Sequence, residues 1–101
     1  MSGFYRFPAM KGLEKLTAES QTVKILEEAD EAKSAQSFWC YGNGSGDDDA
    51  DRRAYGMELM DVIHAAETAL RMEFDDDDVY RLRERVIEKN AGRFYYREDD
   101  R

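Results

Sequence analysis

The sequence has little of what stabilises secreted, membrane-spanning or multidomain proteins. Its one cysteine, Cys40, allows no intramolecular disulfide and no zinc site built from thiolates alone. No apolar run approaches the length of a transmembrane helix, and residues 1–10 lack the apolar core of a signal peptide. The 101 residues suffice for one domain and are too few for two. We therefore expect one cytoplasmic domain, residues 1–101, with no membrane partner.

Positive charge is also scarce. The chain has 15 Lys and Arg residues against 23 Asp and Glu residues, which gives a net charge of −8. A nucleic-acid polymer or an anionic membrane surface would repel so acidic a protein, so we expect neither as a partner. Apolar residues make up 42% of the chain, which lies in the range of globular proteins.

Strand signals are nearly absent, because β-branched residues are few and no stretch alternates between turns. Helical periodicity instead predicts helices at about 18–36, 49–73 and 76–90, with a short helix at 10–16. Thr17 and Asp75 are expected to cap the first and third long helices. The predicted fold class is all-α. The apolar stripes are Val23, Leu26, Ala29 and Ala32 or Lys33 in the first helix, Tyr55, Leu59, Val62, Ile63, Ala66, Ala69 and Leu70 in the second, and Val79, Leu82 and Val86 in the third.

The segment between the first two long helices is predicted to be a loop. It begins with four residues, Phe38 to Tyr41, and continues through three glycines in five residues. Trp39 and Tyr41 in this loop either stack on a nucleobase or cover the end of the bundle.

The predicted helices make a thin layer, whereas helix bundles usually close a core with four. The second helix also carries apolar residues off its main stripe, at Met57, Met60, Ala65 and Met72. A helix that is apolar on two faces needs two neighbours. We therefore expect oligomerisation to complete the bundle, as a homodimer or a homotetramer.

Two acidic pairs point to a metal. Glu28 and Glu31 are three residues apart in the first helix, and Glu58 and Asp61 repeat this spacing in the second. Residues three apart project from the same side of a helix, where like charges repel. Four carboxylates from two packed helices would suit Mg²⁺ or Mn²⁺. The alternative is that these pairs lie on solvated helix faces, since 38% of the residues are charged.

The acidic residues also follow a known pattern. Glu27 to Glu31 reads E-E-x-x-E, and Glu58 to Asp61 reads E-x-x-D after twenty-six intervening residues. Near the C-terminus, Lys89 to Tyr95 reads K-N-x-x-R-x-Y. Over about residues 17–96 the chain resembles the all-α nucleoside triphosphate pyrophosphohydrolases, which comprise MazG-like proteins, dimeric dUTPases and phosphoribosyl-ATP pyrophosphatase.

The resemblance implies a role for each matching residue. The implied metal ligands are Glu28, Glu31, Glu58 and Asp61. Glu27 would lie beside them and, with Glu28, form the catalytic pair, orienting or deprotonating the attacking water. The implied substrate-binding residues are Lys89 and Arg93 for the phosphates, Asn90 for the sugar or base, and Tyr95 and Trp39.

Together these features predict a Mg²⁺-dependent enzyme, with Mn²⁺ as a possible substitute. It would hydrolyse a nucleoside triphosphate to a monophosphate and pyrophosphate, in housecleaning of the nucleotide pool. One alternative is an enzyme similar to dUTPase or to phosphoribosyl-ATP pyrophosphatase. The other is a non-catalytic helical protein with an oligomerisation or regulatory role.

Overall fold

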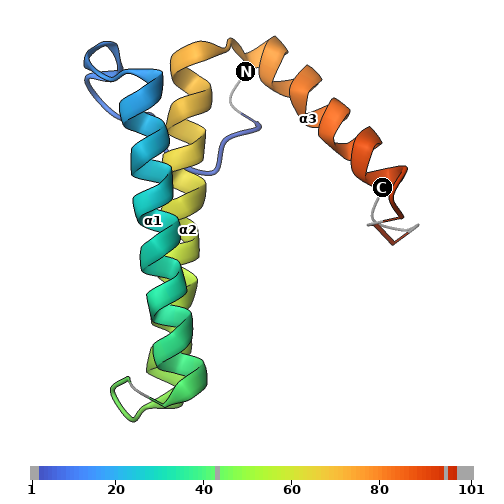
Figure 1. Ribbon diagram of the computed structural model, residues 1–101. Helices are drawn as coiled ribbons and strands as arrows, with labels where there is room; N and C mark the ends of the chain where they lie inside the picture. The colour runs from blue at the N-terminus through green and yellow to red at the C-terminus, as the bar shows by residue number, and fades with distance from the viewer. Residues whose placement is uncertain (1–2, 43, 95, 98–101) are drawn as a thin grey trace. The chain divides into compact units, whose positions relative to one another are not determined.

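The computed structural model describes residues 3–42, 44–94 and 96–97 (Figure 1). Over these ranges the chain forms a short 3-10 helix, η1 (Leu13–Lys15), and three α-helices, α1 (Ala18–Tyr41), α2 (Asp48–Glu73) and α3 (Asp76–Ala91). The same ranges contain no strand, which confirms the all-α prediction. None of the helices in the described part of the chain combines the length and the hydrophobicity needed to cross a lipid bilayer.

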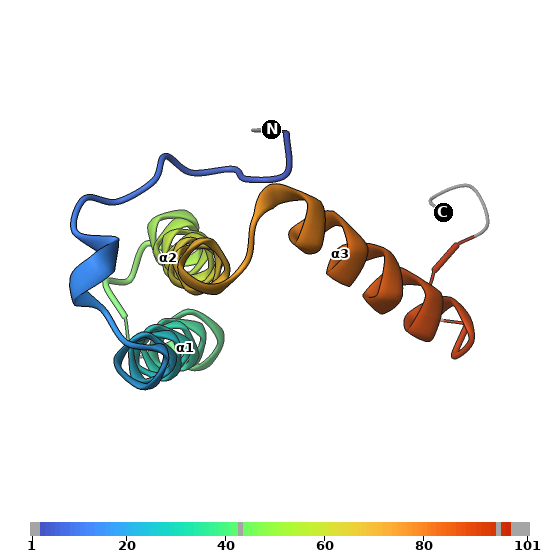
Figure 2. The same cartoon turned by 90° about the horizontal axis from the view of Figure 1, so that it is seen from above.

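The chain divides into two compact units. The hairpin unit, Arg6–Glu73, contains η1, α1 and α2, and the α3 unit consists of Met1–Tyr5 and Phe74–Arg101. In the hairpin unit α1 and α2 lie side by side and run antiparallel (Figures 1 and 2). In the α3 unit the ring of Phe4 packs edge-on against Tyr80, with the ring centroids 6.0 Å apart. The single domain predicted for residues 1–101 stays a prediction.

Local capping residues determine where the helices begin, as predicted. Thr17 and Ser20 form a reciprocal capping box at the start of α1, with both hydrogen bonds at 3.0 Å. At the start of α3 the carboxylate of Asp75 accepts a hydrogen bond from the backbone N–H of Asp78 at 2.8 Å. The predicted short helix at 10–16 is present only as the single turn of η1.

The predicted end of the first helix is wrong. The segment from Phe38 to Tyr41, expected in a loop, forms the last turn of α1. Packing explains the extension, because the indole of Trp39 stacks on Tyr55 of α2 with ring centroids 5.7 Å apart. The helix stops at Gly42, whose φ of 73° is a left-handed conformation that glycine adopts without strain.

The face that α1 presents to its neighbour also differs from the predicted stripe. Val23 and Leu26 are 48% and 64% exposed, whereas Gln21, Glu28 and Ala32 are buried. Six of the eight buried and half-buried positions of α1 recur at intervals of four and three residues, the spacing of helices packed lengthwise; the other two are Gln36 and Ser37. The six positions are Gln21, Ile25, Glu28, Ala32, Ala35 and Trp39.

Only part of the apolar stripe predicted on the second helix is shielded from solvent. Val62, Ala66 and Ala69 of this stripe are half-buried, whereas Leu59 and Ile63 are 41% and 38% exposed. Small and polar side chains therefore occupy much of the contact between α1 and α2. Larger apolar side chains remain on the outside of the hairpin unit.

The segment that precedes α1 is fastened to α2. We call residues 6–16 the strap; it is the dark blue chain that passes α2 in Figure 2. The carboxylate of Glu67, only 5% exposed, accepts hydrogen bonds from the backbone N–H groups of Arg6 at 3.0 Å and Phe7 at 3.1 Å. The ring of Phe7 stacks on the imidazole of His64, with centroids 4.8 Å apart.

We expect Glu67→Ala to release the strap. The substitution leaves the backbone N–H groups of Arg6 and Phe7 without their acceptor, which should cost about 1–3 kcal/mol in the free energy of unfolding. Hydrogen exchange at these two amides should accelerate, and urea unfolding measures the stability. Glu73→Ala, at an exposed position of the same helix, is the control and should change little. Unchanged exchange in Glu67→Ala would contradict this account of the strap.

Candidate metal centre

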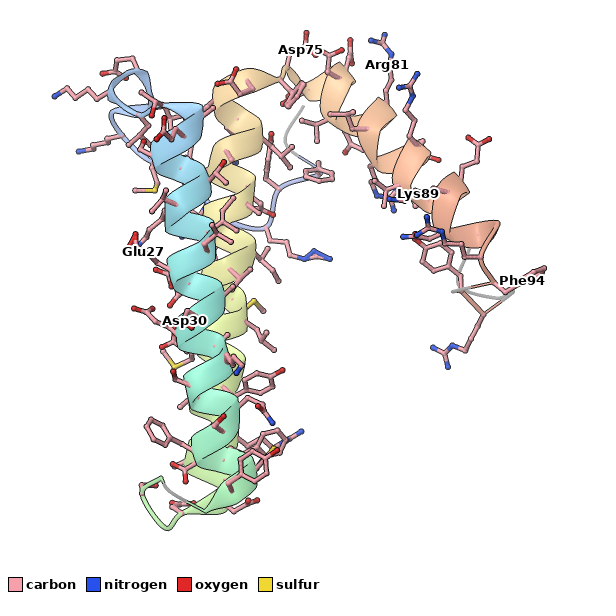
Figure 3. The ribbon with its side chains drawn as sticks, viewed as in Figure 1. Glu27, Asp30, Asp75, Arg81, Lys89 and Phe94 are labelled. Carbon is pink, nitrogen blue, oxygen red and sulfur yellow. The ribbon has the colours of Figure 1, made fainter. Side chains whose placement is uncertain are left out.

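The structure brings three of the four predicted metal ligands together. Glu28 and Glu31 on α1 and Glu58 on α2 each place one carboxylate oxygen so that the three atoms lie within 4.8 Å of one another. Glu28 is buried, Glu58 is half-buried and Glu31 is exposed, so the group opens to solvent on one side. Figure 3 shows the surrounding side chains, with Glu27 and Asp30 labelled in the middle of α1. We call Glu28, Glu31 and Glu58 the acidic cluster.

Asp61, the fourth predicted ligand, does not belong to this group of closely spaced oxygens. It is exposed on α2, three residues after Glu58, and it lines a neighbouring pocket together with Glu27 and Glu28. Glu27, the predicted partner of the attacking water, therefore borders the cluster without joining it.

A lysine that the sequence analysis did not single out contacts the cluster. Lys24 Nζ lies 2.7 Å from Glu28 Oε1, and this hydrogen-bonded ion pair lowers the pKa of Glu28 and raises that of Lys24. Lys24 precedes Glu28 by four residues, the spacing at which helical side chains meet, so the sequence contained the signal. One carboxylate of the cluster is thus neutralised by the protein itself.

The other two carboxylates have no such counterion in the described part of the chain. The negative charge of Glu28 is the main cause of a raised pKa at Glu31, followed by burial, and Glu58 acts in the same direction. Glu58 Oε2 has almost no solvent-accessible surface and no hydrogen-bond partner among the described residues. Burying an unpaired carboxylate oxygen is costly, and a bound cation would remove that cost. The residues present therefore fit a divalent cation, because Mg²⁺ and Mn²⁺ prefer hard oxygen ligands.

Trp39, the predicted base-stacking residue, lines an open groove on the hairpin. Its indole N–H donates a hydrogen bond to Asp48 Oδ1 at 3.1 Å, and its ring stacks on Tyr55. The groove measures about 750 Å³ and includes two arginines, Arg52 and Arg53, that the sequence analysis did not assign. It also includes Asp61, so it begins beside the acidic cluster.

A second pocket, of about 510 Å³, lies between the strap and the two helices. We call it the strap pocket. Its lining combines acidic, neutral polar and apolar side chains from all three segments. Six of its lining residues are Met10, Leu16, Gln21, His64, Ala65 and Thr68.

The remaining predicted substrate-binding residues belong to the α3 unit. Lys89 lies in the last turn of α3 and is labelled in Figure 3, and Arg93 follows the helix; both are exposed. Asn90 donates a hydrogen bond from its side-chain amide to the hydroxyl of Tyr96 at 3.3 Å. Tyr95 lies outside the described residues. The roles of Lys89, Asn90, Arg93 and Tyr95 toward a nucleotide stay predictions.

Comparison of the chain with protein-family models, with curated proteins and with solved structures finds no match. The interpretation of the acidic cluster therefore depends on its geometry and on the sequence pattern that carries it.

We expect Glu31→Gln to stabilise the protein in the absence of divalent cations. The pKa of Glu31 is raised, so its charged form is disfavoured in the folded state, mainly by the charge of Glu28. This penalty is absent below the ordinary glutamate pKa of about 4.3 and appears in full once the pH has risen above the raised pKa. The melting temperature of Glu31→Gln should thus exceed that of the wild type at neutral pH in EDTA, and the difference should vanish near pH 4.

Asp30→Asn is the matched control for this comparison. Asp30 precedes Glu31 on α1 and is exposed, and it does not belong to the acidic cluster. Its melting temperature should stay close to that of the wild type at both pH values. A destabilised Glu31→Gln at neutral pH would show that the cluster contains no repulsion to relieve.

Proposed function

We propose that the protein is a divalent-cation-dependent nucleotide pyrophosphohydrolase that acts in the cytoplasm on a nucleoside triphosphate. The observation that carries the proposal is the convergence of Glu28, Glu31 and Glu58 from two helices, with Glu58 Oε2 lacking any hydrogen-bond partner among the described residues. These residues belong to the sequence pattern that resembles the all-α nucleoside triphosphate pyrophosphohydrolases.

In this proposal Glu28, Glu31 and Glu58 would hold Mg²⁺ or Mn²⁺. Asp61, three residues after Glu58 on α2 and outside the acidic cluster, would contribute a further oxygen, directly or through water. A bound cation supplies charge neutralisation on the phosphate oxygens and lowers the pKa of water. Glu27, exposed at the rim of the strap pocket, accepts the proton of the attacking water. Lys24, which is paired with Glu28 in the structure, would be available to a phosphate if a cation took its place.

The substrate range within this class stays open to the two related activities, hydrolysis of dUTP and of phosphoribosyl-ATP. One observation favours a non-catalytic alternative. The Lys24–Glu28 ion pair already neutralises part of the acidic cluster, as expected for a helical protein with a regulatory or oligomerisation role. Hydrolysis of nucleotides by the protein distinguishes the catalytic possibilities from the non-catalytic one.

We further propose that the working unit is a homodimer or a homotetramer. The hairpin unit exposes large apolar side chains on both helices, including Leu26 at 64%, Met57 at 70% and Met60 at 50%. Contiguous exposed apolar surface is unusual in a monomer, and a second copy of the chain is the simplest partner to bury it. In such an assembly Lys89 and Arg93 of one copy can serve the cluster of another.

We expect Glu58→Gln to abolish both cation binding and turnover. Wild-type protein should be stabilised by Mn²⁺ or Mg²⁺, by about 2.7 kcal/mol at a cation concentration one hundredfold above the Kd. The variant should lose this stabilisation because it lacks the carboxylate that α2 contributes to the cluster. Thermal unfolding with and without cation measures the first effect, and pyrophosphate release from a panel of nucleoside triphosphates measures the second.

Asp30→Asn removes the same charge from an exposed position of α1, and it should keep the cation effect and the turnover. The proposal fails if wild-type protein releases no pyrophosphate from any nucleotide tested. It also fails if Glu58→Gln retains full activity.

We expect Leu26→Glu to dissociate the oligomer without unfolding the hairpin. Leu26 is 64% exposed in the single chain, so a charge at this position disturbs only a contact with another copy. Light scattering should report a mass above the 11.7 kDa of one chain for the wild type and a smaller mass for the variant. Asp30→Asn should keep the wild-type mass. A wild-type mass of one chain would contradict the oligomer.

A further inference from the structure

The strap pocket extends along the hairpin, away from the acidic cluster. Asp61 and Thr68 of α2 both line it, and their separation of seven positions corresponds to roughly 10 Å of α-helix. The antiparallel helix α1 contributes Glu28 and Gln21, again seven residues apart. One end of the strap pocket is therefore acidic, and the far end, formed by His64, Ala65, Thr68 and Gln21, lies about one to two helical turns away.

The far end of the strap pocket is largely apolar. Met10 and Leu16 of the strap and Ala65 of α2 form its walls. Pockets for small molecules are typically apolar with a few placed polar groups, and a methionine thioether packs favourably against aromatic rings. The two strap residues reach the pocket because Glu67 holds the strap on α2.

One polar side chain at this end has no partner. The amide of Gln21 donates to the carbonyl of Ala65 at 2.9 Å, and the hydroxyl of Thr68 donates to the carbonyl of His64 at 3.0 Å. His64 Nε2, in contrast, has almost no solvent-accessible surface and no hydrogen-bond partner among the described residues. Its ring is held by stacking on Phe7. Because His64 lines the strap pocket, a ligand bound there could supply the partner that this nitrogen lacks among the described residues.

We infer that the far end of the strap pocket binds the base of the nucleotide, with His64 hydrogen-bonding to the edge of the base. This inference rests on the proposed function, because it places the phosphates toward the acidic cluster. A planar ring with nitrogen or oxygen on its edge satisfies His64 and packs against the apolar walls. An aliphatic group leaves His64 unpaired, and Lys24, the lysine that lines the strap pocket, is paired with Glu28 of the acidic cluster.

The strap thereby selects the substrate. Met10 and Leu16 form part of the base site only while the strap is attached, and its anchor, Glu67, is not among the residues that line the pocket. Glu67→Gln keeps the size of the side chain but places an amide against backbone N–H donors. We expect this variant to bind the base more weakly while the helix pair stays folded.

Nuclear magnetic resonance of labelled methionine methyls and of the single histidine tests the inference directly. The full chain is titrated with ribonucleosides and deoxyribonucleosides at millimolar concentrations, in EDTA so that no cation is needed. At least one nucleoside should shift the signals of Met10 and His64 to saturation. Met57 and Met60, which line the groove beside Trp39, should not shift. Ribose, which carries no base, is the control ligand and should shift none of these signals.

The variant His64→Phe keeps an aromatic ring against Phe7 but removes the nitrogen, and it should bind the nucleoside about tenfold more weakly, as followed at Met10. Asp30→Asn should bind as the wild type does. Shifts at Met57 and Met60 alone, no shift at Met10, or full affinity in His64→Phe would each overturn the inference.

Pyrophosphate release with Mg²⁺ or Mn²⁺, measured on the same samples, separates this inference from the proposed function. Release without nucleoside binding at Met10 refutes the base site and leaves the function standing. Saturable binding at Met10 and His64 without release supports the base site and refutes the function.

Discussion

The burial of carboxylates in the contact between α1 and α2 is the constraint on which the rest of the structure depends. Glu28 occupies an inward position of α1, and Glu58 approaches it from α2, where lengthwise helix packing normally places apolar side chains. Lys24 forms its ion pair with Glu28. Glu58 Oε2 keeps no partner among the described residues, so the hairpin carries an electrostatic cost that a cation would remove.

Besides this electrostatic cost, the contact between α1 and α2 is poor in large apolar side chains. Ala32 and Ala65 are the fully buried apolar residues of the hairpin's described part, while Leu26 and Met57 face outward. The helix pair therefore gains less from hydrophobic burial than its length would allow. We propose that this arrangement serves the function proposed above, with small residues at the contact beside the carboxylates and an outward apolar surface that another copy of the chain would bury.

Sequence reasoning succeeded where the determining interactions are local. Thr17 and Asp75 cap their helices through residues three positions away, and the i,i+3 spacing of Glu28 and Glu31 places both on one side of α1. The meeting of these two with Glu58 followed from a recognisable pattern across both helices. The capping and i,i+3 signals lie within short windows of the sequence, whereas the acidic pattern spans two helices.

Prediction from the sequence failed where the decisive contact joins residues that are far apart in the chain. The helical turn at Trp39 depends on Tyr55, sixteen residues later, and the glycines that follow concealed it. The strap depends on Glu67, about sixty residues after the backbone groups that it binds, and no periodicity announces such a bond. The inward face of α1 was misassigned because apolar residues were taken to point inward, whereas Leu26 points to solvent in the single chain.

The measurement that tests the account most directly is paramagnetic broadening of backbone amide signals by Mn²⁺ at substoichiometric concentration. The chain has three acidic regions that compete for the ion: the cluster of Glu28, Glu31 and Glu58, and the runs at residues 47–51 and 75–78. The account predicts broadening centred on residues 28, 31 and 58, and its loss in Glu58→Gln. Broadening centred on residues 47–51 or 75–78, or spread evenly over all three regions, would contradict it.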